Sequence, residues 1–158
     1  MQPLLLRSSS PMSWAGKKYF KEFFRSLFRK EQAPSDNATP RPAKPLTPAQ
    51  VRRLDAKLDV WVSAKGYCRA DHSIRECAGR IGTDSVKLFR YFAMRNTDFR
   101  SWRTSLRMTE AMELMKSEPD TSVSAIGMRV GVPDRSNFCR QFKLFTGQTP
   151  EVWRKNQK

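Results

Sequence analysis

From Leu46 onward, apolar residues repeat with the period of an α-helix over most of the chain. In the first such stretch, apolar side chains recur three and four residues apart, at Val51, Leu54, Leu58 and Trp61. This spacing places them on one face of a helix. No segment of useful length alternates with the two-residue period of a strand. The pattern therefore predicts an all-α fold.

Capping and turn residues mark where the first predicted helix begins and ends. Thr47 followed by Pro48 is typical of an N-cap with proline at the first helical position. Gly66 is expected to end this helix, since glycine readily adopts the backbone angles that stop one.

Two shorter helices are predicted next, over about 73–95. Ser73 and Glu76 have the spacing of a capping box at the start of the first helix. Gly82 is expected to form the turn, and Thr83 to cap the second helix. The inward positions predicted for the pair are Ile74, Cys77, Ala78, Ile81, Leu88, Tyr91 and Phe92.

A long helix is predicted from about 98 to 116, and Pro119 breaks it. A second pair of short helices follows over about 122–145, with its turn at Gly131 and its second N-cap at Asp134. Ala78 and Gly127 each stand four residues before the turn glycine of their pair, where two helices cross closely. We therefore predict two helix-turn-helix units joined by a long connecting helix.

The net charge indicates a polyanionic partner. The 158 residues include 30 Lys and Arg against 15 Asp and Glu, for a formal net charge of +15. Nine basic and three acidic residues lie in 1–45, and 21 and 12 lie in 46–158, so both parts carry an excess. Nucleic acid and anionic membrane are the partners that such a charge favours.

The region before the helical part divides into three predicted segments: a disordered start (1–13), a basic amphipathic helix (14–30) and a proline-rich linker (31–45). The helix would present one apolar face, formed by Phe20, Phe23, Phe24, Leu27 and Phe28. Its composition suits an anionic membrane surface or a partner protein. It equally suits a helix that docks on its own domain, or an arm that orders only when bound.

The sequence gives little support for a catalytic site or a metal site. Cys68, Cys77 and Cys139 have no metal-binding spacing, and His72 is the only histidine. No paired carboxylates, phosphate loop or nucleophile motif stands out. The aromatic stripe of the last helices has helical spacing, which favours core packing over base stacking. We expect no enzyme, no cofactor and no metal.

The last third of the chain carries a specific motif. It runs Ser136-x-Phe138-x-Arg140-x-Phe142-Lys143, then Gly147-x-Thr149-Pro150, then Trp153-Arg154. With the segment from Trp102 to Ala111, the motif closely resembles the DNA-binding domain of the AraC/XylS family of transcription regulators, over about 46–158. The resemblance implies a homeodomain-like fold whose two recognition helices enter successive major grooves on one face of DNA.

The resemblance and the outward faces together give candidate contacts. The predicted base contacts are Val86, Phe89 and Arg90 in the first unit and Arg135, Ser136, Asn137 and Arg140 in the second. Phe89 has two alternatives, contact with a thymine methyl or burial against a neighbour. The predicted phosphate contacts are Lys87, Lys143 and Arg154. Arg103 and Arg107 are expected to be structural, paired with Glu110 or Glu113.

These observations predict a sequence-specific regulator of transcription that binds double-stranded DNA, in the cytoplasm and on the nucleoid. RNA polymerase is a candidate partner. The alternative is a membrane-surface or adaptor protein that acts through residues 14–30, at the inner face of the membrane, with the helical domain as a non-specific nucleic-acid binder or scaffold. Family members usually carry a sensor domain, so two interpretations of the start are the remnant of a longer membrane sensor and a truncated product.

Overall fold

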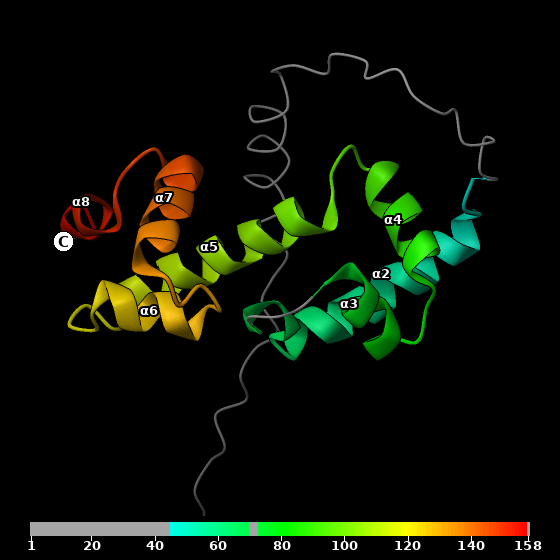
Figure 1. Ribbon diagram of the computed structural model, residues 1–158, viewed down its shortest axis with the longest axis horizontal. Helices are drawn as coiled ribbons and strands as arrows, with labels where there is room; N and C mark the ends of the chain where they lie inside the picture. Colours follow the sequence, from blue (N-terminus) through cyan, green and yellow to red (C-terminus); the bar gives the residue numbers. More distant parts are fainter. Residues whose placement is uncertain (1–44, 70–72, 158) are drawn as a thin grey trace, which may run out of the picture. The chain divides into compact units, whose positions relative to one another are not determined.

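A computed structural model describes residues 45–69 and 73–157, and within these ranges all regular structure is helical (Figure 1). The all-α prediction is confirmed. The elements are α2 (Pro48–Ser63), the short 3₁₀ helix η1 (Gly66–Cys68), α3 (Ile74–Arg80), α4 (Ser85–Ala93), α5 (Phe99–Ser117), α6 (Val123–Arg129), α7 (Arg135–Thr146) and α8 (Pro150–Lys155).

Several predictions concern residues outside the described ranges. These are the disordered start, the amphipathic helix over 14–30 with its apolar face, nearly all of the linker over 31–45, and His72. Among the described residues, no helix is long and apolar enough to span a bilayer.

The long helix α5 serves two separate hydrophobic cores. Its first half contributes Phe99, with Trp102 and Leu106 packed beside it, to a core shared with α2, η1, α3 and α4. Its second half contributes Met108, Ala111 and Met115 to a core shared with α6, α7 and α8. Each helix-turn-helix unit therefore has its own core, and α5 belongs to both (Figure 1).

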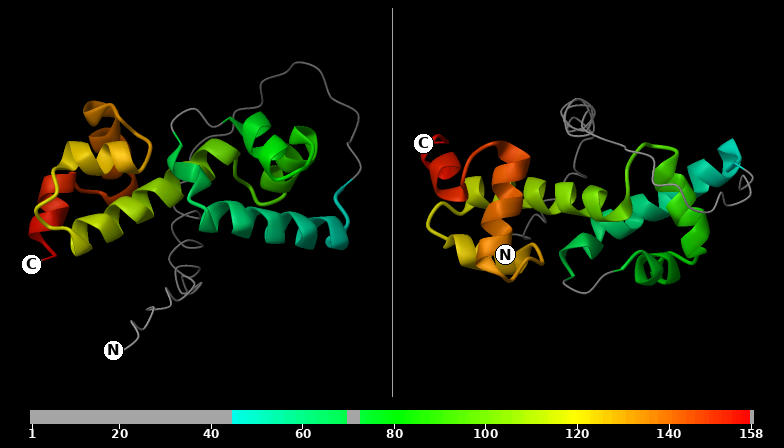
Figure 2. Two further views of the ribbon diagram at one scale, coloured as in Figure 1. Left: turned by 90° about the horizontal axis from the view of Figure 1, so that it is seen from below. Right: turned by 45° about the horizontal axis from the view of Figure 1, so that its top comes forward.

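The first core is rich in aromatic rings. Trp61 and Trp102 stack at 5.7 Å between ring centroids, and Phe92 lies 5.1 Å from Trp102. α3 and α4 pack closely against each other, with α2 beside α4 (Figure 2). Cys77 and Ala78 of α3 are buried, as the pattern predicted.

Side-chain caps begin both short helices of the first unit. The capping box of Ser73 and Glu76 is present, which confirms that prediction. The N-cap of α4, however, is Asp84 and not Thr83: its carboxylate accepts a hydrogen bond from the Val86 N–H at 2.6 Å. A carboxylate one residue closer to the helix replaces the hydroxyl, because it interacts more favourably with the positive end of the helix dipole.

The second unit follows the same plan with a tighter crossing. Asp134 caps α7, as predicted, and accepts from the Asn137 N–H at 2.6 Å. A Cβ at Gly127 would lie 2.9 Å from the Val132 carbonyl oxygen and 3.2 Å from Phe138 Cγ. Glycine therefore allows α6 and α7 to approach each other closely.

The expected role of Gly66 was wrong. α2 ends at Ser63 with Ala64 as its C-cap, and Lys65 takes the left-handed backbone conformation at φ +52°. Gly66 begins η1 and lies against the Trp61 indole, which a Cβ would overlap. The close approach to a core ring, rather than helix termination, requires glycine at this position.

Candidate nucleic-acid interface

The outward face of α7 presents polar and basic side chains. Phe138 and Phe142 are fully buried on the opposite side of the helix, which leaves Arg135, Ser136 and Arg140 exposed. The burial of both rings shows that this aromatic stripe is core. α7 is therefore an amphipathic helix whose free face consists largely of hydrogen-bond donors.

Asn137 lies half-buried beside this face and contacts Arg140. Its Oδ1 accepts from Arg140 Nη2 and from Gln141 Nε2, each at 3.0 Å. Asn137 is thus positioned to orient the guanidinium of Arg140 one turn further along the helix. Arg135 pairs with Glu151 of α8 at 3.1 Å, with both side chains largely in solvent.

The corresponding face of α4 is more apolar. Leu88, Tyr91 and Phe92 are buried, while Val86 and Phe89 are 54% and 64% exposed. Burial of Phe89 against a neighbour is therefore ruled out, and its ring is free for an apolar contact. Val86 and Phe89 stand three residues apart, so together they form a small apolar patch on α4, which makes it a candidate contact surface.

The two helices carry arginine in the same register. α4 is capped by Asp84 and α7 by Asp134, and in each helix an arginine stands six residues after the cap. Leu88 and Phe138, four residues after each cap, are both fully buried. Arg90 and Arg140 therefore occupy equivalent positions relative to the core of their own unit.

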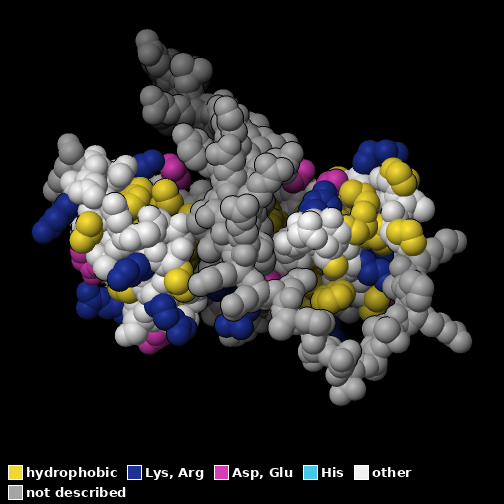
Figure 3. Space-filling view, turned by 90° about the horizontal axis from the view of Figure 1, so that it is seen from above, with side chains coloured by type: hydrophobic (Ala, Val, Ile, Leu, Met, Phe, Trp, Pro, Cys, Tyr) yellow, Lys and Arg dark blue, Asp and Glu magenta, His cyan; other side chains and the backbone are white. Residues whose placement is uncertain are grey.

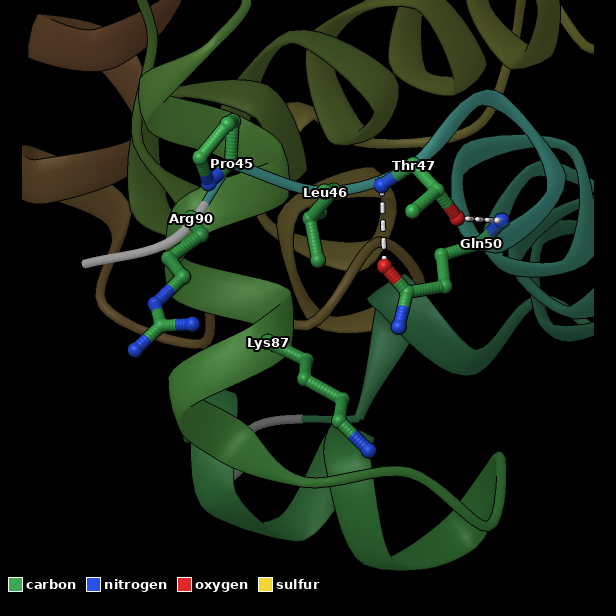
Figure 4. A pocket seen from close by; sticks show the side chains of 6 residues that line it. All are labelled: Pro45, Leu46, Thr47, Gln50, Lys87 and Arg90. Carbon is green, nitrogen blue, oxygen red and sulfur yellow. Dashed lines mark hydrogen bonds between the residues drawn. The ribbon is translucent and has the colours of Figure 1, made fainter.

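Arg90 lies at a small hollow beside the start of α2. The hollow has a volume of about 210 Å³ and is lined by Pro45, Leu46, Thr47, Gln50, Lys87 and Arg90 (Figure 4). The Thr47 and Gln50 side chains close the capping box of α2 at its rim, with Thr47 N donating to Gln50 Oε1 at 2.9 Å. Two cationic side chains of α4 thus border a concave surface.

The three predicted phosphate contacts differ in accessibility. Lys87 and Lys143 are exposed. Arg154 is half-buried: Nη1 donates to the Pro119 carbonyl at 3.0 Å, and Nε and Nη2 are shielded from solvent. Arg154 therefore also ties α8 to the loop before α6.

Arg107 is structural, as expected, but its partners differ from the predicted carboxylates. Its Nε donates to the Tyr67 carbonyl at 2.6 Å and its Nη2 to the Arg69 carbonyl at 2.7 Å. Glu110 instead pairs with Lys65 at 2.5 Å, and Glu113 with Lys116 at 3.8 Å. A local helix rule missed these partners because they lie about forty residues away in the sequence.

Positive charge lies on both units in the face that Figure 3 shows. In the view of Figure 3, Lys and Arg side chains appear at the α4 end and at the α7 end.

The described residues contain no cluster of three or more His, Cys, Asp or Glu side chains suited to a metal ion. Burial raises the pKa of the Cys77 thiol to about 12, and burial also raises the pKa of Cys68 and Cys139. These thiols are protonated, poorly nucleophilic groups at neutral pH.

Two capped helix-turn-helix units, with arginine in the same register on the second helix of each, are the arrangement expected of a DNA-binding protein. The family model described as "Helix-turn-helix domain" matches residues 71–156. The chain belongs to this family, that of AraC-type helix-turn-helix domains, and is a DNA-binding transcription regulator. A search of curated proteins found no match.

Three solved structures with the same fold are described as a transcriptional regulator or as C-terminal domains of response regulators. One is a DNA-binding transcriptional dual regulator from Escherichia coli K-12 (17% identity, TM-score 0.58, covering 73% of this chain and 97% of that one). Another is the C-terminal domain of AraT, a response regulator from Geobacillus stearothermophilus (24%, 0.57, 70% and 87%). A third is the C-terminal domain of the two-component response regulator yesN from Fusobacterium nucleatum subsp. nucleatum ATCC 25586 (18%, 0.57, 65% and 98%). At these identities the likeness establishes the shared fold.

Proposed function

We propose that the protein regulates transcription by reading specific base pairs of double-stranded DNA with two helices, α4 and α7, in separate major grooves. The observation that supports this most is the equivalent register of Arg90 and Arg140 on two independently capped helices. A helix of this kind fits the width of the major groove, where the four base pairs present distinct donors and acceptors.

In the second unit, Arg140 is the proposed main reader. Arginine binds the O6 and N7 atoms of guanine with two parallel hydrogen bonds. The Asn137 amide that contacts Arg140 would hold its guanidinium in place as the helix enters the groove. Arg135 and Ser136 stand in the first turn of α7, the part of a recognition helix that approaches base edges.

In the first unit, Val86 and Phe89 are proposed to contact thymine methyl groups, and Arg90 a guanine. Apolar side chains read thymine because only that base places a methyl group in the major groove. The two units would therefore differ in character, with more apolar readout by α4 and more hydrogen bonding by α7.

Lys87, Lys143 and Arg154 are proposed phosphate contacts, which position the helices without reading sequence. A regulator of this family works on chromosomal DNA, so we place it in the cytoplasm and keep RNA polymerase as its candidate protein partner.

The test compares two substitutions on one helix, Arg140→Ala and Lys143→Ala. A preferred duplex is first selected from a random pool with the full chain, and binding to it and to random duplex is measured by fluorescence anisotropy. Arg140→Ala should weaken binding to the selected duplex by about 1–3 kcal/mol and relax preference at one position, with little effect on random duplex. Lys143→Ala should weaken both to a similar extent.

Equal losses on the two duplexes for Arg140→Ala would show that Arg140 contacts only the backbone. Failure of the pool to converge on any sequence would indicate a non-specific nucleic-acid binder.

A further inference from the structure

Three elements from distant parts of the chain meet at one place: η1, the middle of α5 and the turn between α6 and α7. η1 belongs to the first core through Tyr67, and the turn belongs to the second through Val132. The contact among these elements, here called the joint, therefore connects the two helix-turn-helix units. Three kinds of interaction hold it together.

The first is the Arg107 side chain, which is 6% exposed and binds two backbone carbonyls of the first unit. Burial, followed by the charge of Arg103, lowers the pKa of Arg107 to about 10, so the group remains charged at neutral pH. A buried charge is costly unless its hydrogen bonds are satisfied. The rigid guanidinium satisfies them only while the Tyr67 and Arg69 carbonyls stay in place.

The second is the close backbone packing at Gly131, the turn residue of the second unit, which has no side chain. Its φ is +80°, and a Cβ there would overlap the Cys68 carbonyl and lie 2.9 Å from Arg107 Nη2. The α6–α7 turn thus rests directly on the backbone of η1. The turn of one unit cannot shift without displacing a segment of the other, because packed backbone has little room to yield.

The third is Glu110, one turn along α5 from Arg107. Its carboxylate accepts from Lys65 Nζ at 2.5 Å and from the Tyr67 hydroxyl at 3.2 Å. Tyr67 is therefore held at both its backbone carbonyl and its side chain by α5. η1 is fixed to the connecting helix on two sides.

We propose that the joint sets the distance and rotation between α4 and α7, and so determines which spacing between two half-sites the protein accepts. This inference rests on the proposed function, because spacing matters only if both helices read base pairs. Arg107, Glu110 and Gly131 would then be positioning residues that determine specificity from inside the protein. A flexible connection would let each helix find its groove separately, whereas a fixed one demands a single register.

The experiment measures the spacing penalty: the ratio of Kd for a duplex with one base pair inserted between its half-sites to Kd for the selected duplex. Insertion moves the second half-site by about 3.4 Å and by roughly a tenth of a turn. In the native protein the penalty should be at least about tenfold, because the contacts of one helix are lost. Binding to each half-site alone is measured in parallel.

Arg107→Met and Glu110→Gln should reduce the penalty to within about threefold, while each half-site alone is bound as by the native protein, since the reading faces are untouched. The matched control is Glu113→Gln, the same change one turn away on α5, at an exposed residue outside the joint. It should keep the full penalty. The ratio cancels any general change in affinity that the altered charge causes.

Folded variants, judged by cooperative thermal melting, that keep the full penalty would overturn the proposal. So would a native protein that binds both half-sites specifically but tolerates the insertion, or a Glu113→Gln variant that loses the penalty as Glu110→Gln does. If Arg107→Met does not fold, Glu110→Gln decides, because it preserves size and the Arg107 contacts. Loss of all sequence preference in the native protein would instead refute the proposed function.

Discussion

Arg107 and Arg140 are chemically identical side chains to which their surroundings give opposite roles. Arg140 is exposed on α7 and donates a hydrogen bond to the neighbouring Asn137 amide, so its guanidinium stays accessible to a ligand. Arg107 is buried and divides its donors between two backbone carbonyls. Both are basic residues on helices, and only their contacts in the folded protein distinguish a proposed base-contacting arginine from a structural one.

Glycine offers the sharpest residue-scale prediction, since Gly131 and Gly147 share the same left-handed backbone. Their φ angles are +80° and +79°, but an added Cβ would overlap the Cys68 carbonyl only at Gly131 and would meet nothing within 4 Å at Gly147. Gly147→Ala should cost about 1 kcal/mol of unfolding free energy from backbone strain. Gly131→Ala should cost more, because the steric overlap adds to the strain.

Urea denaturation measures both values. The exposed helical residue Gly79 supplies the control, because a Cβ there meets nothing and Gly79→Ala should stabilise the protein by about 0.4–1 kcal/mol. Equal costs for Gly131→Ala and Gly147→Ala would mean that the turn does not press on η1.

Glu118 gives a pH-dependent prediction. Its hydrogen bond with Arg129, and then that with Thr121, hold the pKa of the carboxyl below its usual value of 4.5. A depressed carboxyl pKa contributes stability above the unfolded-state pKa, and this contribution is lost as the pH falls through the folded-state value. The melting temperature of the native protein should therefore drop more on acidification below pH 4.5 than that of Glu118→Gln. An equal fall of the melting temperature with pH in the two proteins would contradict the Glu118–Arg129 contact.

At the scale of elements, helix caps control whether the reading helices are formed. Asp84 and Asp134 each accept a backbone N–H at 2.6 Å in the first turn of α4 and α7. Asp84→Ala and Asp134→Ala should each cost about 0.5–2 kcal/mol of stability. Asp120→Ala, at an exposed position outside any helix, makes the same change of charge and should be nearly neutral. Urea denaturation of the three variants separates capping from charge, and a cost for Asp120→Ala equal to the others would argue against capping.

The elements that were predicted correctly depend on local sequence, and those that were missed depend on distant contacts. The capping box at Ser73, the cap at Asp134 and the burial of Cys77 follow from residues within one or two turns. η1 does not: its glycine is explained by Trp61, and its anchors Arg107 and Glu110 lie some forty residues away. The exposure of Phe89 also needed the structure, because an apolar residue at helical spacing suits a core equally well.

At the scale of the whole molecule, charge and geometry contribute different parts of DNA binding. The net charge of +15 provides attraction to any duplex and a steep dependence on salt, because binding releases counterions from the phosphates. The folded units provide discrimination among sequences. Neither part alone makes a regulator, because non-specific sites on a chromosome greatly outnumber specific ones.

The phosphate contacts can be counted from this salt dependence. Lys87→Ala and Lys143→Ala should each lower the slope of log Kd against log salt concentration by about 1, on selected and random duplexes alike. Phe89→Ala removes no charge and should leave the slope unchanged while it reduces affinity for the selected duplex. Anisotropy titrations at several salt concentrations measure both quantities, and an unchanged slope for either lysine variant would remove that residue from the phosphate contacts.

The most direct test of two-helix reading is a selection from random duplexes repeated with the native protein, Arg90→Ala and Arg140→Ala. The native protein should enrich two clusters of preferred base pairs whose centres lie about 10–10.5 base pairs apart, one helical turn of DNA. Each variant should lose preference within one cluster and keep the other. Loss of preference at the same cluster in both variants, or a single cluster for the native protein, would contradict the claim that α4 and α7 each read a groove.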